Sequence, residues 1–471
     1  MIDGRDSAIC GRSRNCKDSL ARKETGMGKL AIVLAGGGSR GAYQIGVWKA
    51  LRELGIDYQI VTGASVGALN GAIMVQKDFD LALEMWEKLT TPDIVDIDLK
   101  PEDVDYQKRH WEAGVWQSFI QKSLEENGVD FAPLEKIMRD VVSEQRVRES
   151  DVDLGVVTVE YPSMKPLELS KKDIPEGKLI DYLVASAACF PAFKSKQIDD
   201  KQYIDGGYRD NLPINLAISM GADEVLAINL DSVGVLKKPK NQSVPVQYIS
   251  SSWDLGPFLW FEPTLTARNI KLGYLDAMKL YGKMEGGAYT FLPREIRYNA
   301  ERMAPFADEI FAMARESMGG PDYFQHLARF RLVKAMRRNP KEEITVEEVV
   351  TSAMEIAGKL MEVDPTKAYT AKSFNEAILE KFAGVEGIIG DTLEEIRNTK
   401  VFVLKDVLDR VQKEGKSHIV SFLYGELKRI MAEGSDMGEF WGLAMMVPTE
   451  LIAAVYIYGL KRMEDAEKTE E

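Results

Sequence analysis

A serine flanked by glycines occurs at residues 63–67, where Gly63 and Gly67 lie two residues to either side of Ser65. This Gly-x-Ser-x-Gly pattern forms a nucleophile elbow when it joins a strand to a helix, because small neighbours let the two elements approach closely. The apolar run Tyr58–Thr62 precedes it and the helical pattern Val66–Val75 follows it. The spacing predicts nucleophilic chemistry at Ser65, assisted by the positive end of the following helix.

A glycine-rich loop occupies residues 36–41 (GGGSRG), between the apolar run Leu30–Ala35 and the helical pattern Ala42–Leu54. Consecutive glycines reach dihedral angles that are closed to other residues. The N–H groups at the start of the following helix attract negative charge. We expect this loop to bind an anion or a developing negative charge. If the two runs are neighbouring parallel strands, it meets Ser65 at one edge of the sheet.

The same loop also satisfies the pattern Gly-x-Gly-x-x-Gly of dinucleotide-binding folds. Such folds place an acidic residue about 20 residues further on, at the end of the second strand. Asp57 has the right spacing, but it precedes the run Tyr58–Thr62 instead of following it. A dinucleotide-dependent oxidoreductase therefore remains only a minor alternative.

A serine nucleophile needs a base, and histidine is the usual one. The chain has 3 histidines, and none follows a predicted core strand: His110, His326 and His418. We therefore expect a carboxylate to act directly on the serine. Asp205 is the best candidate, because it follows the short run Gln202–Ile204 and precedes a glycine pair. Asp210 and Asp231 are rivals near other strand ends.

Three motifs in this order, GGGSRG at 36–41, GASVG at 63–67 and DGG at 205–207, resemble the patatin-like phospholipase family. The segments ASAACFPAF at 185–193 and DNLPINLAISMGADEVLAINL at 210–230 support the resemblance, which covers roughly residues 28–295. The family hydrolyses acyl esters of phospholipids and other lipids, usually without a metal. The resemblance thus implies a lipid substrate, no metal and no cofactor.

The resemblance also implies a role for each motif. Ser65 would be the nucleophile and Asp205 the proton acceptor, with Gly206 and Gly207 forming the turn after it. The glycine-rich loop would form the oxyanion hole, with the amides of Gly37, Gly38 and Arg40 as the expected donors. The residues assigned to this hole are Gly36, Gly37, Gly38, Arg40 and Gly41. The Arg40 guanidinium would either steady the loop or meet a lipid phosphate. A catalytically weak lipid-binding or protein-binding relative is the alternative function.

Strands alternating with helices over the first part of the chain predict an α/β fold, a three-layer sandwich with a mostly parallel central sheet. The expected strands are Leu30–Ala35, Tyr58–Thr62, Leu154–Glu160, Gln202–Ile204, Glu224–Leu230 and Ala288–Leu292. The expected domains are a polar arm (1–27), which ends at a Met27 that could itself start translation, a patatin-like catalytic domain (28–299) and a helical C-terminal region (300–471).

The C-terminal region is expected to be helical throughout. Thr345 and Glu348 form a capping box before the first of its helical patterns. These patterns are Val346–Val363, Ser373–Phe382, Leu393–Glu414 and Ile419–Glu433. The apolar stretch Trp441–Leu460 approaches membrane length but contains Pro448 and Glu450. Packing in a core is therefore favoured over insertion in a membrane, where a central carboxylate is costly.

Composition narrows the class of partner. Lys+Arg 60 against Asp+Glu 74 gives a net charge of −14, which does not support nucleic-acid binding. Three scattered cysteines indicate a reducing compartment, so we expect a cytoplasmic protein, with peripheral membrane contact as an option. The aromatic run Trp253–Phe261 suits a loop that enters a lipid surface, a lid over the acyl site, or packing between the core and the helical C-terminal region. The sequence predicts no oligomeric state.

Overall fold

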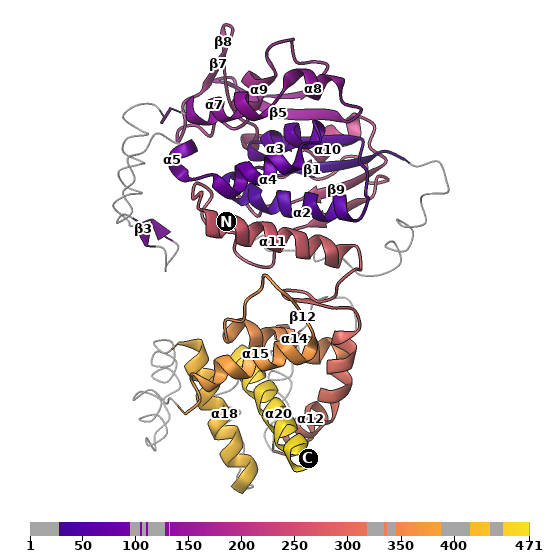
Figure 1. Cartoon of the computed structure of the whole chain (residues 1–471), viewed down its shortest axis with the longest axis vertical. Coiled ribbons are helices and arrows are strands. Elements are labelled where there is room, and N and C mark those ends of the chain that lie inside the picture. Colours follow the sequence, from indigo (N-terminus) through magenta and orange to yellow (C-terminus); the bar gives the residue numbers. More distant parts are fainter. Residues whose placement is uncertain are drawn as a thin grey trace. The chain divides into compact units, whose positions relative to one another are not determined.

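The computed structural model describes residues 28–94, 104–105, 110–111, 128–130, 132–317, 334–336, 345–387, 415–433 and 446–470. The chain forms two compact units, which meet in sequence between Gly282 and Lys283 (Figure 1). This division lies before the domain boundary expected after residue 299, because the strand expected at Ala288–Leu292 belongs to the second unit. The expected arm at 1–27 lies outside the described residues.

The first unit is built on one mixed sheet in the order β10-β9-β1-β2-β5-β8-β7, with β6 paired to β5. The pairs from β10 to β5 are parallel, whereas β6, β7 and β8 pair antiparallel. Its strands are β1 (Leu30–Leu34), β2 (Ile60–Ala64), β5 (Asp153–Tyr161), β6 (Lys165–Ser170), β7 (Lys196–Ile198), β8 (Lys201–Asp205), β9 (Glu224–Ile228) and β10 (Val246–Ile249). The prediction of a mostly parallel sheet is confirmed.

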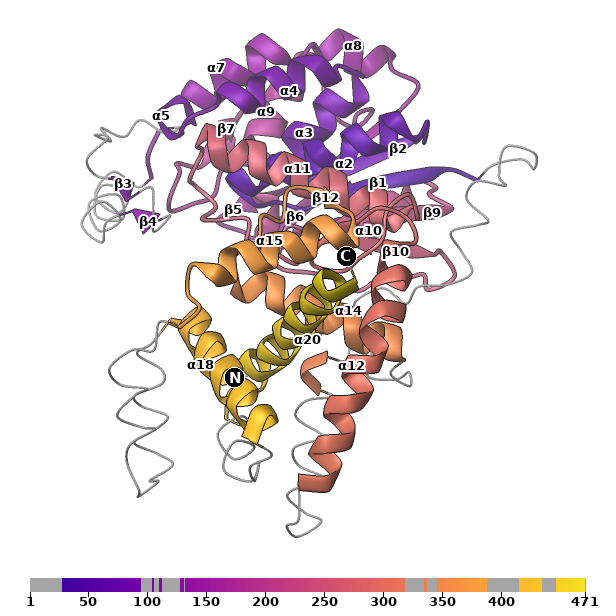
Figure 2. The same ribbon diagram turned by 60° about the horizontal axis from the view of Figure 1, so that its bottom comes forward.

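Helices cover both faces of this sheet, as Figure 2 shows from a second side. On one face, Gly71 of α3 packs over Val61 and Leu154. On the other face, the Thr62 hydroxyl bonds to the Pro213 carbonyl beside α10. Because successive strand residues point to opposite faces, α3 and α10 lie on opposite sides. The helices of this unit are α2 (Ala42–Glu53), α3 (Val66–Val75), α4 (Phe79–Lys88), α5 (Thr91–Ile94), α7 (Ala132–Val141), α8 (Glu144–Glu149), α9 (Leu179–Ser186), α10 (Ile214–Ser219) and α11 (Pro263–Leu280). A short antiparallel pair, β3 (Val104–Asp105) and β4 (His110–Trp111), also precedes α7.

The second unit is mainly helical, as expected. Its elements are β11 (Thr290–Phe291), α12 (Glu295–Ser317), α14 (Val346–Leu360), β12 (Ala368–Tyr369), α15 (Ala371–Ala383), α18 (Lys416–Glu433) and α20 (Pro448–Glu470). β11 pairs with β12, which is why the chain from Lys283 belongs here. The predicted capping box at Thr345 and Glu348 is confirmed. The helix expected at Leu393–Glu414 lies outside the described residues.

The apolar stretch near the C-terminus packs against other helices. Pro448 begins α20, which contacts α14 and α18, and Glu450 in its first turn is buried. Packing in a core, the favoured interpretation, is confirmed for the part from Pro448 onward, while residues 441–445 lie outside the described chain. None of the described helices combines the length and apolar character needed to cross a membrane.

Candidate active site

The strand β5 explains how Ser65 and Asp205, distant in sequence, come together. A strand has two edges, and β6 occupies one edge of β5 at this level. Both β2 and β8 therefore pair with the other edge. Ala64 pairs with Val157 and Asp205 pairs with Thr158. Since β2 is parallel and β8 antiparallel to β5, their ends meet head to head, with Ser65 directly after β2.

Ser65 lies at a strained turn between β2 and α3. Its backbone has φ 53° and ψ −133°, a region that non-glycine residues seldom occupy. A Cβ at Gly63 would lie 2.3 Å from the Gly67 carbonyl carbon, and a Cβ at Gly67 would lie 2.3 Å from the Leu34 oxygen. The two flanking glycines therefore permit the close approach that an elbow requires.

Asp205 is buried, and burial raises the pKa of its carboxyl group to about 6. Hydrogen bonding with the Ser65 hydroxyl and the Gly207 amide, 2.7 Å from Oδ1, partly offsets this rise in pKa. A carboxylate with a pKa near 6 is a stronger base than an exposed aspartate and is still ionised at pH 7. The position suits a group that accepts a proton from the serine.

The glycine-rich loop presents two free amides instead of the expected three. The Gly36 amide donates to the Asn211 carbonyl at 3.1 Å, and the Arg40 amide donates to the Gly37 carbonyl at 3.2 Å. Within the part of the chain that the structure describes, the amides of Gly37 and Gly38 donate no hydrogen bond. Because the Gly36 and Arg40 amides are engaged in these hydrogen bonds, the amides of Gly37 and Gly38 are the donors that we keep for the expected oxyanion hole.

The Arg40 side chain fastens this loop to neighbouring segments. Its Nε donates to the Gly256 carbonyl at 2.7 Å, and its Nη1 donates to the carbonyls of Asp231 at 2.7 Å and Leu230 at 3.3 Å. Three backbone oxygens thus hold the guanidinium in place. Of the two expected roles for Arg40, this geometry favours steadying the loop over meeting a lipid phosphate.

A cavity of about 640 Å³ opens beside Ser65 and Asp205. Gly37, Gly38 and Gly207 also line it. Most of its other lining residues are apolar, including Val66, Leu69, Met85, Trp86, Leu89, Ile94, Leu134, Ile137, Met138, Phe193, Leu259 and Phe261. A largely apolar space with a few convergent polar groups is typical of a binding site for an apolar ligand.

The aromatic run Trp253–Phe261 contributes to this cavity mainly by packing. Trp260 and Phe261 are buried, and the Phe261 ring stacks on Trp86 with 6.1 Å between centroids. Phe258 is the large apolar side chain of this run that is exposed. The burial of Trp260 and Phe261 favours packing over entry into a lipid surface for these two side chains.

The other titratable groups near the site lie outside the cavity or are less suited to act as the base. Asp210 is buried and does not line the cavity; its Oδ2 is 3.4 Å from the Lys237 Nζ. Asp231 lines the cavity but is exposed. Burial and the nearby Asp205 raise the pKa of the Cys189 thiol to about 11, so it stays protonated at neutral pH.

The histidines add no base to the site that the structure describes. No histidine is among the described residues lining the cavity. His418 lies on α18 of the second unit. The side chain of His110 and the whole of His326 lie outside the described part of the chain.

Two polar residues outside the three motifs position the site. The Ser65 amide donates to Ser186 Oγ at 2.9 Å, and this hydroxyl donates to the Val157 carbonyl at 2.6 Å. The Asn211 side chain donates to the Gly36 carbonyl at 3.4 Å. A buried hydroxyl or amide needs a hydrogen-bond partner. The signal in the sequence for Ser186 is a serine within an apolar helical pattern.

A buried polar chain links the cavity wall to the glycine-rich loop. The Trp86 indole N–H donates to Asn70 Oδ1 at 2.9 Å, and Asn70 Nδ2 donates to Gln44 Oε1 at 2.9 Å and to the Gly41 carbonyl at 3.1 Å. Gln44 in turn donates to the Ala35 carbonyl at 2.8 Å. Both ends of the loop are therefore held by side chains beneath it.

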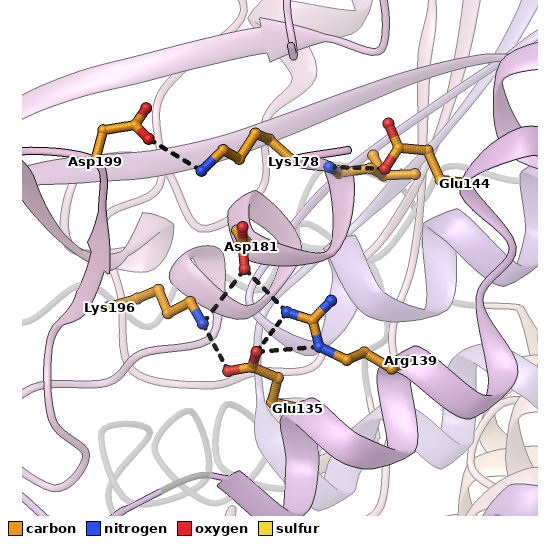
Figure 3. A network of polar contacts seen from close by, with 8 residues as sticks. Glu135, Arg139, Glu144, Lys178, Asp181, Lys196 and Asp199 are labelled. Carbon is orange, nitrogen blue, oxygen red and sulfur yellow. Dashed lines mark hydrogen bonds and ion pairs between the residues drawn. The ribbon is translucent and has the colours of Figure 1, made fainter. Parts of the chain in front are cut away.

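An ion-pair network holds α7, which supplies Leu134, Ile137 and Met138 to the cavity (Figure 3). Glu135 lies 2.6 Å from both Arg139 and Lys196, and Asp181 lies 3.2 Å and 3.4 Å from the same two cations. Burial raises the pKa of Glu135, but hydrogen bonds from Lys196 and Arg139 outweigh it and lower the pKa overall. The network joins α7 to α9 and β7.

One family model and several known proteins match part of this chain. The family model described as patatin-like phospholipase matches residues 32–218. Patatin-like phospholipase domain-containing protein 7 of Rattus norvegicus is 28% identical over 219 residues, which are 45% of this chain and 14% of that protein. Lysophospholipase nte1 of Aspergillus terreus is 27% identical over 221 residues, 45% of this chain and 12% of that protein.

The chain thus spans only a small part of the curated relatives it matches. Among solved structures, VipD from Legionella pneumophila covers 93% of this chain and 90% of its own, at 14% identity and a TM-score of 0.36. The matched segment holds the glycine-rich loop, the serine elbow and the Asp205 turn. Residues 32–218 of this chain thus match the patatin-like phospholipase family model.

Proposed function

We propose that the chain is a serine acyl hydrolase that cleaves fatty-acyl esters of phospholipids or related lipids, with Ser65 as nucleophile and Asp205 as base. The head-to-head meeting of β2 and β8 on β5 carries this proposal, because it sets a buried carboxylate beside a strained serine. The apolar cavity beside them suits an acyl chain. The family match supports lipid acyl hydrolysis in general.

The reaction would proceed in two steps. Asp205 accepts the Ser65 proton as the serine oxygen attacks the ester carbonyl, and the amides of Gly37 and Gly38 stabilise the oxyanion. The leaving alcohol takes the proton from Asp205, which gives an acyl-enzyme. Water then attacks the acyl carbonyl while Asp205 accepts a proton from it. The bond between the acyl group and Ser65 breaks, Asp205 returns the proton to the serine oxygen, and the free fatty acid leaves.

Hydrolysis of p-nitrophenyl esters and of a phospholipid tests this proposal. Ser65→Ala should abolish both activities, whereas Ser219→Ala, an exposed serine on α10, should retain them. Wild-type protein without activity on either substrate would favour the alternative, a lipid-binding or protein-binding relative. We keep the expected cytoplasmic location as a proposal that rests on the cysteine content alone.

A further inference from the structure

Several exposed residues that line the cavity have apolar side chains, alongside the exposed carboxylate of Asp231. Val233, Val235, Phe258 and Tyr208 all line the cavity, and all are exposed. Val233 is 102% exposed, which leaves its side chain entirely in water. Single exposed apolar residues are ordinary on a protein surface, but a group at the entrance of an apolar cavity indicates an interaction site.

Positive charge follows directly after these residues in the chain. Leu236 is 54% exposed, and Lys238 and Lys240, which follow shortly after it in the sequence, are also exposed. Lys237 is partly neutralised, because its Nζ lies 3.2 Å from Glu168 and 3.4 Å from Asp210. We call residues 232–240 the rim loop. It combines apolar and basic side chains in a chain whose net charge is −14.

Hydrogen bonds hold the rim loop in one shape. The Val235 amide donates to the Gly207 carbonyl at 2.9 Å, and the Asn211 amide donates to the Val235 carbonyl at 2.7 Å. The Asn215 side chain accepts from the Lys240 amide at 2.8 Å and donates to the Lys238 carbonyl at 3.1 Å. Because the loop is already ordered, its binding costs little conformational entropy, which favours affinity.

We infer that the rim loop, together with Phe258, docks the first unit onto an anionic lipid bilayer. The apolar side chains would enter the boundary between headgroups and acyl chains, and Lys238 and Lys240 would meet anionic headgroups. The cavity opening would then face the bilayer, so that an acyl chain reaches Ser65 without crossing water. This inference rests on the proposed function, because it takes the cavity to accept a lipid.

Vesicle partitioning tests the inference with the full chain carrying Ser65→Ala, so that no lipid is hydrolysed. Vesicles of phosphatidylcholine alone are compared with vesicles that also contain phosphatidylserine. Val233→Ser/Leu236→Ser should weaken binding to both by roughly ten- to a hundredfold, from the lost apolar burial. Lys238→Gln/Lys240→Gln should weaken binding to the anionic vesicles by about ten- to thirtyfold and leave neutral vesicles unchanged.

Matched variants control for general surface effects. Val346→Ser/Leu292→Ser removes two exposed apolar side chains of the second unit, and Lys172→Gln/Lys271→Gln removes two exposed lysines that are not part of the rim loop. Both should bind like the parent. Equal losses in these controls, or unchanged binding in the rim-loop variants, would overturn the inference, the latter pointing to a protein partner for this surface.

The esterase assay separates this inference from the proposed function. The protein could hydrolyse a soluble p-nitrophenyl ester while the rim-loop substitutions leave vesicle binding unchanged. This result would refute the docking surface and leave the proposed hydrolase activity standing. Binding that depends on the rim loop, in a protein without esterase activity, would support the docking surface and refute the hydrolase.

Discussion

Ser65 and Asp205 each occupy a position that costs folding free energy. The φ of 53° at Ser65 belongs to a class of backbone strain worth about 1–3 kcal/mol. Burial raises the pKa of Asp205 to about 6, which means that its charged form is destabilised where it stands. Costs of this kind persist where the surrounding structure enforces them, and they gather at functional sites.

The pKa of Asp205 predicts how activity depends on pH. The base must be ionised, so kcat/KM for a soluble ester should be level above pH 7 and fall about tenfold for each pH unit well below pH 6. A pH–rate profile with an uncharged p-nitrophenyl ester measures this dependence. A profile that stays flat down to pH 4.5, in buffers where the protein remains folded, would contradict the role of Asp205 (~4.5 being already well below the raised pKa).

The same raised pKa predicts that Asp205→Asn stabilises the fold. A protonated Asp205 carboxyl group contributes stability below its unfolded pKa, and this stability is lost as pH rises through about 6. An amide at this position has no charge to desolvate. At pH 7 the variant should therefore be inactive yet more stable than wild type by about 1–3 kcal/mol.

Urea unfolding of both proteins at pH 7 and near pH 4 measures this difference in stability. The difference should shrink toward zero at about pH 4, where both side chains are neutral. A variant that is less stable than wild type at pH 7 would show that the Asp205 charge stabilises the fold, which is the opposite of the expected effect.

At the scale of elements, burial decides which strands a sequence can predict. β1, β2, β5 and β9 are buried over most of their length, so they read as apolar runs and were predicted within a few residues. β6 and β7 carry exposed polar side chains, and β10 is a short strand interrupted by Gln247. All three were missed, because no apolar run marks them. The strand at β11 was predicted, but its pairing with β12 is a long-range contact that no local pattern contains.

The same distinction between local sequence patterns and long-range contacts applies to the candidate site. The motifs around Ser65 and Asp205 could be found because their residue types and spacing are local. The engaged amides of Gly36 and Arg40 could not be predicted, because one of them depends on a carbonyl at Asn211, far along the chain. Ser186 and Asn211 were missed for the same reason, since their partners come from other elements.

The buried chain beneath the glycine-rich loop predicts a positioning role for Asn70. Asn70→Ala would remove the Asn70 acceptor of the Trp86 N–H and the Asn70 donor to Gln44 Oε1, at a cost of about 1–3 kcal/mol for each buried group. The loop should then hold the oxyanion less well, so kcat should fall at least tenfold with little change in KM (about 1.4 kcal/mol in the barrier).

Steady-state kinetics on a soluble ester, with thermal unfolding in parallel, separates these two effects. The control is Gln145→Ala, which removes an exposed hydrogen bond on α8. A fall in stability with kcat unchanged would show that Asn70 serves the core alone.

The ion-pair network on α7 predicts an effect on the preference for the acyl chain length of the substrate. Lys196→Met leaves Glu135 and Asp181 with Arg139 as their remaining shared cation, which should loosen the α7 wall. KM should rise about three- to tenfold for long-chain esters and stay unchanged for short ones, from about 1 kcal/mol of lost wall stability. Lys178→Met, which removes a pair with the exposed Asp199, is the matched control (Figure 3). Equal effects on long and short esters would refute this role for the network.

At the scale of the whole molecule, the proposed chemistry belongs to the first unit. Every residue lining the cavity precedes Gly282. The second unit follows residues 32–218, the segment matched by the family model. The matched segments are 14% of patatin-like phospholipase domain-containing protein 7 and 12% of lysophospholipase nte1, so the activities of those whole proteins are not carried over to this chain.

Labelling of the full chain with a fluorophosphonate, followed by peptide mass mapping, tests the assignment of Ser65 as nucleophile most directly. We predict a single covalent adduct on Ser65, absent in Ser65→Ala and strongly slowed in Asp205→Asn. An adduct on any other residue, or undiminished labelling of Ser65→Ala, would contradict this assignment.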